Sequence, residues 1–325
     1  MILLLLACTK SPAELESDAI LAVKDETDVQ LHALADAAVA LREAAPDAAG
    51  WSAADTADAE AAWRDARTAY ERVEGAIAVL FPDLDASTDE RYDGFLADGP
   101  DDYLFDAEGV RGVHAIERIL WAGRHPDYVV AFESGLPYYV PAAFPADEAE
   151  IGDFRDSLCA QLVTDTATLR DQFAPVALDS AAAFRGVIGS LAEQREKVDL
   201  AASGEDESRY AQHTLGDMRA NLAGGRATFD AFTPWLEALD GGALIDEVNA
   251  GFDRVDAAYD ALSGDAVPAV PSTWNPDAPS DSDLATDYGQ LWSLLQLEAD
   301  PDSPGSLVER MGAAAELLGI PQIPE

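Results

Sequence analysis

The chain has 325 residues and carries 62 acidic against 20 basic side chains, a formal net charge of −42. This length suffices for one large or two modest domains with a sizeable core. A charge of this sign repels nucleic acid and anionic lipid surfaces, so we expect no nucleic-acid partner and no direct membrane contact. The longest apolar runs fall short of the roughly 18 residues of a membrane-spanning helix, so no span is predicted.

The first residues resemble a bacterial lipobox, because Leu5, Leu6 and Ala7 precede Cys8. Signal peptides have a basic start and about 7–15 apolar residues, so either the true start lies upstream or the segment is not a signal. We expect residues 1–8 to be a signal or lipobox segment. Cys8 would then be a lipid anchor in the cell envelope, in the periplasm or at the outer membrane. Cys159 would have no disulfide partner and would be a small buried hydrophobe.

Apolar residues recur at steps of three and four along most of the chain, which is the pattern of amphipathic helices. Helices are expected over residues 17–45, 55–80, 109–123, 147–173, 180–200, 208–239, 244–262, 284–297 and 306–318. Residues 81–106 and 125–146 are expected to be loops, and 263–283 a linker rich in Pro, Ser and Asp. No run alternates strictly enough to predict strands. Long helices joined by short loops predict an all-α fold of antiparallel bundles.

The helix expected over 109–123 reads GVRGVHAIERILWAG and contains a pair of polar residues. His114 and Glu117 are three residues apart, so both side chains leave one face of the helix. An imidazole and a carboxylate placed in this way can bind one metal ion. The same spacing also fits a partly buried hydrogen-bonded pair, and spacing alone does not decide between them.

Three stretches in order resemble the imelysin-like family, and among its members the EfeO-type iron-uptake lipoproteins. GVHAIERILW is similar to the family's GxHxxE segment, and residues 62–85 are similar to its W-x-x-A-R-x-x-Y-x-x-x-E helix and D-L-D turn. EDESRYAQHTLGDMRAN, residues 205–221, resembles its acidic loop and the T-x-x-D helix start. The resemblance implies two four-helix bundles with a metal site in a cleft between them. We therefore divide the chain into 1–8, an N-terminal bundle 9–175, a second bundle 176–265, and a linker with terminal helices 266–325.

The resemblance also implies a set of site residues. The candidate metal ligands are His114, Glu117, Glu74 and either Glu196 or Glu193, and the candidate supporting residues are Asp217 and Arg209. Glu74 faces the interior, where an unpaired carboxylate is costly. Its alternative role is a salt bridge to Arg67 or Arg118.

A site with one histidine and several carboxylates suits iron, as Fe²⁺ or Fe³⁺, better than structural zinc, although copper or zinc can occupy it in vitro. The resemblance thus implies a metal-binding lipoprotein in iron uptake, with an iron permease or a peroxidase-type protein as a partner. A metallopeptidase is one alternative, but Arg118 stands where the inverted zinc motif H-x-x-E-H has its second histidine. A scaffold bundle with a structural His–Glu pair is another. Metal affinity is expected to fall as the pH drops through the pKa of the histidine.

Overall fold

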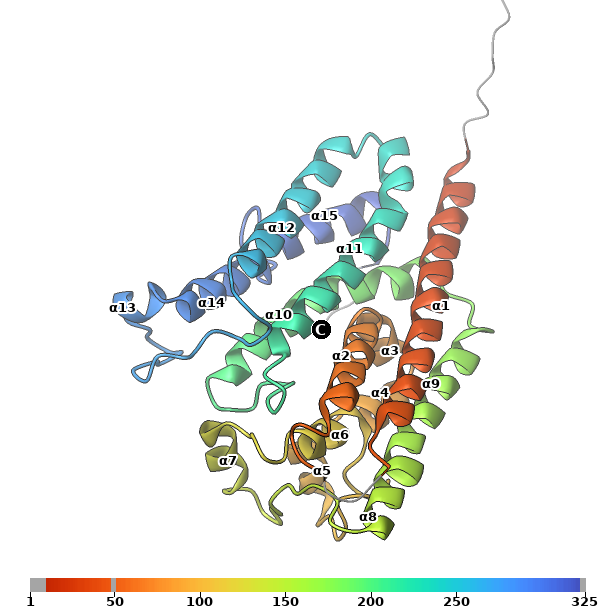
Figure 1. Ribbon diagram of the computed structural model, residues 1–325. Helices are drawn as coiled ribbons and strands as arrows, with labels where there is room; N and C mark the ends of the chain where they lie inside the picture. Colours follow the sequence, from red (N-terminus) through yellow and green to blue (C-terminus); the bar gives the residue numbers. More distant parts are fainter. Residues whose placement is uncertain (1–9, 48–50, 322–325) are drawn as a thin grey trace, which may run out of the picture.

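The computed structural model describes residues 10–47 and 51–321, and every regular element in these ranges is helical (Figure 1). The helices are α1 Pro12–Ala44, α2 Ala57–Glu71, α3 Glu74–Leu80, α4 Pro82–Asp89, α5 Tyr92–Asp98, α6 Gly112–Leu120, α7 Asp127–Glu133, α8 Glu148–Asp153, α9 Cys159–Phe173, α10 Ser180–Ala201, α11 Thr214–Ala238, α12 Gly242–Asp260, α13 Asp281–Leu284, α14 Asp287–Glu298 and α15 Leu307–Leu318, with a π-helical turn, Phe154–Leu158, between α8 and α9. The predicted all-α fold is confirmed. Within the described ranges no helix has the length and apolar character to cross a membrane. Cys8 lies outside these ranges.

Two large hydrophobic cores organise the helices. One is built mainly from α2, α6 and α9, with Trp63 and Ile116 among its buried side chains. The other is built from α10, α11, α12, α14 and α15, with Phe229 and Met311 among its members. Burial of such side chains stabilises each core by about 1.5–3 kcal/mol per large residue. The division into two four-helix bundles and the boundaries at 175 and 265 stay predictions.

Helix α1 connects the two cores. It begins with a capping box, in which the Ser11 hydroxyl accepts from the Glu14 amide and the Glu14 carboxylate accepts from the Ser11 amide. Its first half contributes Val23 to the core around α11, and its second half contributes Leu41 to the core around α2. Figure 1 shows α1 running beside α9 along the molecule.

The helix predicted over 55–80 is interrupted. Helix α2 ends at Glu71 and α3 begins at Glu74, and the Val73 amide donates to the Tyr70 carbonyl between them. Gly224 of α11 approaches this turn so closely that a Cβ atom there would lie 2.3 Å from the Arg72 carbonyl oxygen. The break buries the carboxylates of both Glu71 and Glu74.

The prediction of a loop over residues 81–106 was wrong, because α4 and α5 lie within it. Helix α3 ends at Leu80, just before Pro82, and Pro82 then occupies the first turn of α4, where its missing N–H removes no hydrogen bond. Both helices are short and rich in Asp, so they show no apolar period. Helix α4 ends at Asp89, which places that carboxylate at the site described below. Helix α7 likewise lies within the expected loop 125–146.

Replacement of Gly224 by alanine is expected to destabilise the protein by about 1–3 kcal/mol, because the new methyl group would overlap the Arg72 carbonyl. Gly242, at the start of α12, serves as the control, because a Cβ atom at that position would have no neighbouring atom within 4 Å. Urea unfolding of Gly224→Ala and Gly242→Ala measures both effects. Equal stabilities for the two variants would contradict the close approach of α11.

Candidate metal site

The guanidinium of Arg67 lies at the centre of a buried group of carboxylates. Arg67, on α2, has no exposed surface and forms ion pairs with Glu71, Asp89 and Glu207. Its Nε atom lies 3.4 Å from Asp217 Oδ2. These carboxylates come from α2, α4, the turn before α11 and α11 itself. Arg67 therefore holds four separate segments of the chain around one point.

Helix α6 brings His114 to this point because Gly112 allows a close contact. Gly112 has a φ of 82°, a conformation that favours glycine. A Cβ atom at this position would lie 2.5 Å from the Thr88 carbonyl oxygen. The start of α6 thus rests directly on the end of α4, and His114 Nε2 lies 3.4 Å from Asp89 Oδ1. This packing therefore requires the glycine of the GxHxxE segment, Gly112.

Glu117 fixes the orientation of the histidine ring. His114 Nδ1 lies 2.8 Å from Glu117 Oε2, and Glu117 Oε1 accepts hydrogen bonds of 2.9 and 2.7 Å from the amides of Tyr210 and Ala211. Both oxygens of Glu117 therefore already have partners. Such a carboxylate on one ring nitrogen is typical of metal-binding histidines, because it sets which nitrogen faces the ion.

The other ring nitrogen, Nε2 of His114, is buried without a hydrogen-bond partner in the described part of the chain. It lies 3.9 Å from Glu207 Oε1 and 3.4 Å from Asp89 Oδ1. One ligand atom from each of these three residues lies within 4.8 Å of the other two. Ligands about 2.1 Å from one ion are separated by roughly 3.0–4.2 Å, so these three groups fit a single small ion with little movement.

A second carboxylate group lies beside the first and shares Glu207. It contains Glu71 and Glu74, and one oxygen from each of the three lies within 4.8 Å of the others. Glu74 Oε2 accepts from Asn221 Nδ2 at 2.9 Å and pairs with Lys197 Nζ at 3.3 Å. The partner of Glu74 is thus Lys197, and neither Arg67 nor Arg118 pairs with it.

A cleft of about 220 Å³ leads from the surface to Asp89 and Glu207. Six carboxylates line it, against the two cations Arg91 and Lys197; the six are Asp85, Asp89, Glu90, Glu193, Glu196 and Glu207. Glu196 is exposed at this cleft, whereas Glu193 Oε1 reaches Lys197 at 3.1 Å. The excess of negative charge favours entry of cations.

The structure brings together some of the predicted residues and separates others. His114 and Glu117 are in contact, and Asp217 is near Arg67 while accepting from the Ser208 hydroxyl. Arg209 pairs with Asp93 at 2.6 Å and is not part of the carboxylate group. Glu74 lies in the second group, next to Lys197. None of these roles in metal binding is tested by the geometry, and they stay predictions.

Asp89 and Glu207 were missed as candidate ligands. Asp89 falls in a stretch that shows no helical period, so its position could not be deduced. Glu207 belongs to the acidic turn 205–207 that resembles the family's acidic loop. That acidic turn was the available signal, but a turn does not show which of its carboxylates faces inward.

The charges of the site depend strongly on one another. Burial raises the pKa of the Asp89 carboxyl to about 6, although Arg67 opposes the shift. Burial alone would lower the pKa of His114, but the carboxylates of Asp89, Glu117 and Glu207 around the ring raise it well above the usual range. Although burial opposes it, Arg67 and Lys197 hold the pKa of Glu207 well below that of an ordinary glutamate. In the absence of a cation, His114 therefore holds a proton that an ion at Nε2 would replace.

The family model of the imelysins matches residues 29–292, which include all the residues of the site. This chain belongs to the imelysin family. It is similar to the iron uptake system component EfeO of Escherichia coli strain K12, with 27% identity over 204 residues, 63% of this chain and 44% of that protein. The protein of the same name from Yersinia pseudotuberculosis is 28% identical over 205 residues, 63% of this chain and 45% of the relative. The chain thus matches a little less than half the length of these imelysin relatives.

The buried His114 and the half-buried His125 have opposite charge environments. Burial lowers the pKa of His125 to about 4, and its Nε2–H donates to the Arg118 carbonyl at 2.9 Å. In metal-free protein, His125 should therefore stay neutral at pH 5, whereas His114 should lose its proton at a higher pH than an ordinary histidine does. NMR titration of the four histidine rings, assigned with single-histidine variants, measures both values. Titration of both rings near pH 6.5 would contradict the described environments.

Proposed function

We propose that this protein binds a metal ion, iron in the cell, as cargo for uptake in the cell envelope. The observation that carries the proposal is His114 Nε2, a buried nitrogen with no hydrogen-bond partner in the described chain that faces two carboxylates. A buried polar atom of this kind is costly unless a ligand binds it. The ion would be held by His114, Asp89 and Glu207, and Glu117 would orient the ring.

The chemistry of the donors favours iron. Carboxylate oxygens with a single imidazole suit iron ions, whereas structural zinc sites are dominated by thiolates and several histidines. The relatives named above are iron uptake components, which supports the same cargo. Copper and zinc are expected to bind the same groups in vitro, since both have high affinity for imidazole. An iron permease or a peroxidase-type protein of the envelope would receive or prepare the ion.

The surroundings of the site support binding of cargo rather than peptide hydrolysis. Arg118, at the position of the second histidine of H-x-x-E-H, contacts Glu133 at 3.4 Å and lies 3.8 Å from the centre of the Tyr92 ring. It supplies no ligand to an ion. The acidic cleft beside Asp89 gives cations a path to the site.

Metal titration of purified protein tests the proposal. Ferrous ion under anaerobic conditions, zinc and copper should each bind with one strong site, and His114→Ala should lower the affinity at least about tenfold, or 1.4 kcal/mol. Glu117→Gln should lower it by about 10–100-fold, because the ring loses its orienting carboxylate. Isothermal titration with melting curves measures both effects.

The matched control is His32→Ala, which removes a histidine that is 56% exposed on α1. Its affinity for each ion should equal that of the parent. If His114→Ala binds as tightly as His32→Ala, ions are held by the diffuse acidic surface, and the His114–Glu117 pair is structural. Cleavage of an unfolded substrate that is lost in His114→Ala would favour the peptidase instead.

The proposed envelope location depends on Cys8, which follows Leu5, Leu6 and Ala7. Expressed from the native gene in its host, the parent should incorporate labelled palmitate and fractionate with membranes. Cys8→Ser should lose both the label and the membrane association. Label retained in Cys8→Ser, or absent from the parent, would contradict the lipid anchor.

A further inference from the structure

The ammonium group of Lys197 lies among four carboxylates, three of them buried, beside the proposed ion site. Its Nζ atom is 2.5 Å from Glu207 Oε2, 2.7 Å from Glu71 Oε1, 3.1 Å from Glu193 Oε1 and 3.3 Å from Glu74 Oε2. Lys197 itself is 2% exposed. Buried lysines are rare unless paired, and this one has more carboxylates around it than it has N–H groups.

Three of these carboxylates have the spacing of a metal-binding set without the lysine. One oxygen from each of Glu71, Glu74 and Glu207 lies within 4.8 Å of the other two. In addition, Glu71 is only 1% exposed, and its buried Oε2 atom has no hydrogen-bond partner in the described chain. An acceptor left open in this way is available to a further cation.

Glu207 connects this group to the proposed ion site. Its Oε1 atom faces His114 Nε2 at 3.9 Å, and its Oε2 atom faces Lys197 Nζ. The geometry therefore provides two neighbouring cation positions that share one carboxylate. The lysine is fixed at one of them by the covalent structure of α10, so only the other is open to an ion from solution.

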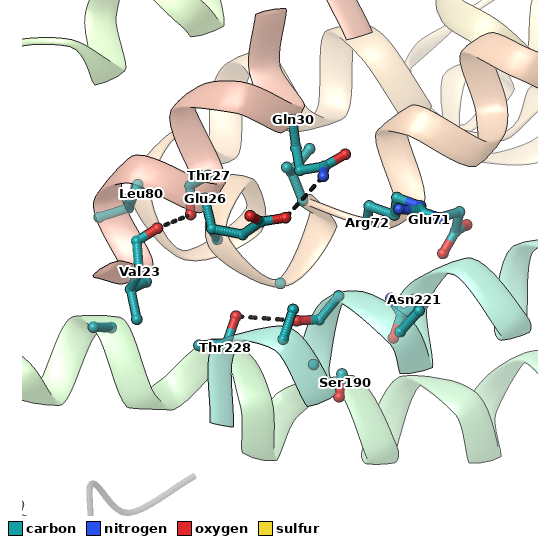
Figure 2. A pocket seen from close by; sticks show the side chains of 18 of the residues that line it. Val23, Glu26, Thr27, Gln30, Glu71, Arg72, Leu80, Ser190, Asn221 and Thr228 are labelled. Carbon is teal, nitrogen blue, oxygen red and sulfur yellow. Dashed lines mark hydrogen bonds between the residues drawn. The ribbon is translucent and has the colours of Figure 1, made fainter. Parts of the chain in front are cut away.

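An ion in place of the ammonium would also have access to water through the acidic cleft, because Lys197, Glu193 and Glu207 line it. Glu71 lines a crevice of about 60 Å³ between α1, the α2–α3 turn, α10 and α11 (Figure 2). Figure 2 shows Glu71 and Asn221 at the same end of this crevice. The volume is enough to hold water. Carboxylates and water together complete the coordination that iron and similar ions need.

We infer that Lys197 is a built-in cation that fills the Glu71, Glu74 and Glu207 group and so limits each chain to a single bound ion. This inference rests on the proposed function, since it concerns the number of ions held at the same site. A displaced Lys197 would be left buried without its carboxylates, which makes competition by a mobile ion unfavourable. Lys197 thus determines the stoichiometry and keeps a second metal ion away from the ion at His114.

Native mass spectrometry and isothermal titration with ferrous ion alone, under anaerobic conditions, test the inference. The parent should bind one ion, and Lys197→Met should bind two. Lys197→Arg keeps the positive charge and should bind one. Lys10→Met removes an exposed lysine that pairs with Asp18 far from the site, and it should also bind one.

The number of bound ions tests the role of Lys197 and the proposed function separately. One ion in both the parent and Lys197→Met overturns the role of Lys197, and so does a second ion in Lys10→Met. No ion in the parent overturns the proposed function itself. If circular dichroism shows that Lys197→Met does not fold, Lys197→Met with Glu193→Gln removes one of the facing charges and leaves Glu71, Glu74 and Glu207 in place. That double variant should bind two ions, and a single ion would overturn the inference.

Discussion

The guanidinium of Arg67 is the group on which the candidate site depends. It is fully buried and contacts carboxylates from α2, α4, the turn before α11 and α11. Removal of one partner from a buried ion pair usually costs about 3–5 kcal/mol, because the remaining charge is left uncompensated. Here the loss of Arg67 would expose Glu71, Asp89 and Glu207 to mutual repulsion. The arrangement that holds the proposed metal ligands together is therefore also the arrangement that stabilises this part of the imelysin fold.

Two glycines make the same arrangement sterically possible. Gly112 lets α6 begin against the end of α4, and Gly224 lets α11 pack on the turn between α2 and α3. The first contact places His114 beside Asp89, and the second buries Glu71 and Glu74 on either side of a helix break. Small residues thus determine where the charged residues meet. The charges then set each other's protonation, as the raised pKa of His114 and the lowered pKa of Glu207 illustrate.

The sequence predicted the helical class and the central pair of the site. Trp63, Ala66 and Tyr70 have a clean helical period, and all three are buried in α2. His114 and Glu117 are in contact as their spacing on one helix requires. These features depend on neighbours within a few residues, where periodicity is informative.

The rest of the site depends on contacts between distant segments, which periodicity does not encode. Asp89 and Lys197 lie on helices far apart in the sequence. Lys197 nevertheless pairs directly with Glu207, and Asp89 pairs with Arg67, which also pairs with Glu207. Glu193 and Lys197 are four residues apart on α10, so their pairing follows from helix spacing. Which side of α10 faces the buried carboxylates and which side stays exposed at the cleft with Glu196 depends on how the helix packs. The family resemblance supplied candidate positions, but it did not supply Lys197 as the partner of Glu74.

A crystal structure of the protein grown with ferrous ion, with anomalous diffraction recorded on both sides of the iron absorption edge, tests the central claim most directly. The account predicts one strong iron peak within bonding distance of His114 Nε2, Asp89 and Glu207, with Glu117 still bound to the far side of the ring. Iron peaks only at exposed carboxylates, with His114 Nε2 left without an ion, would contradict it.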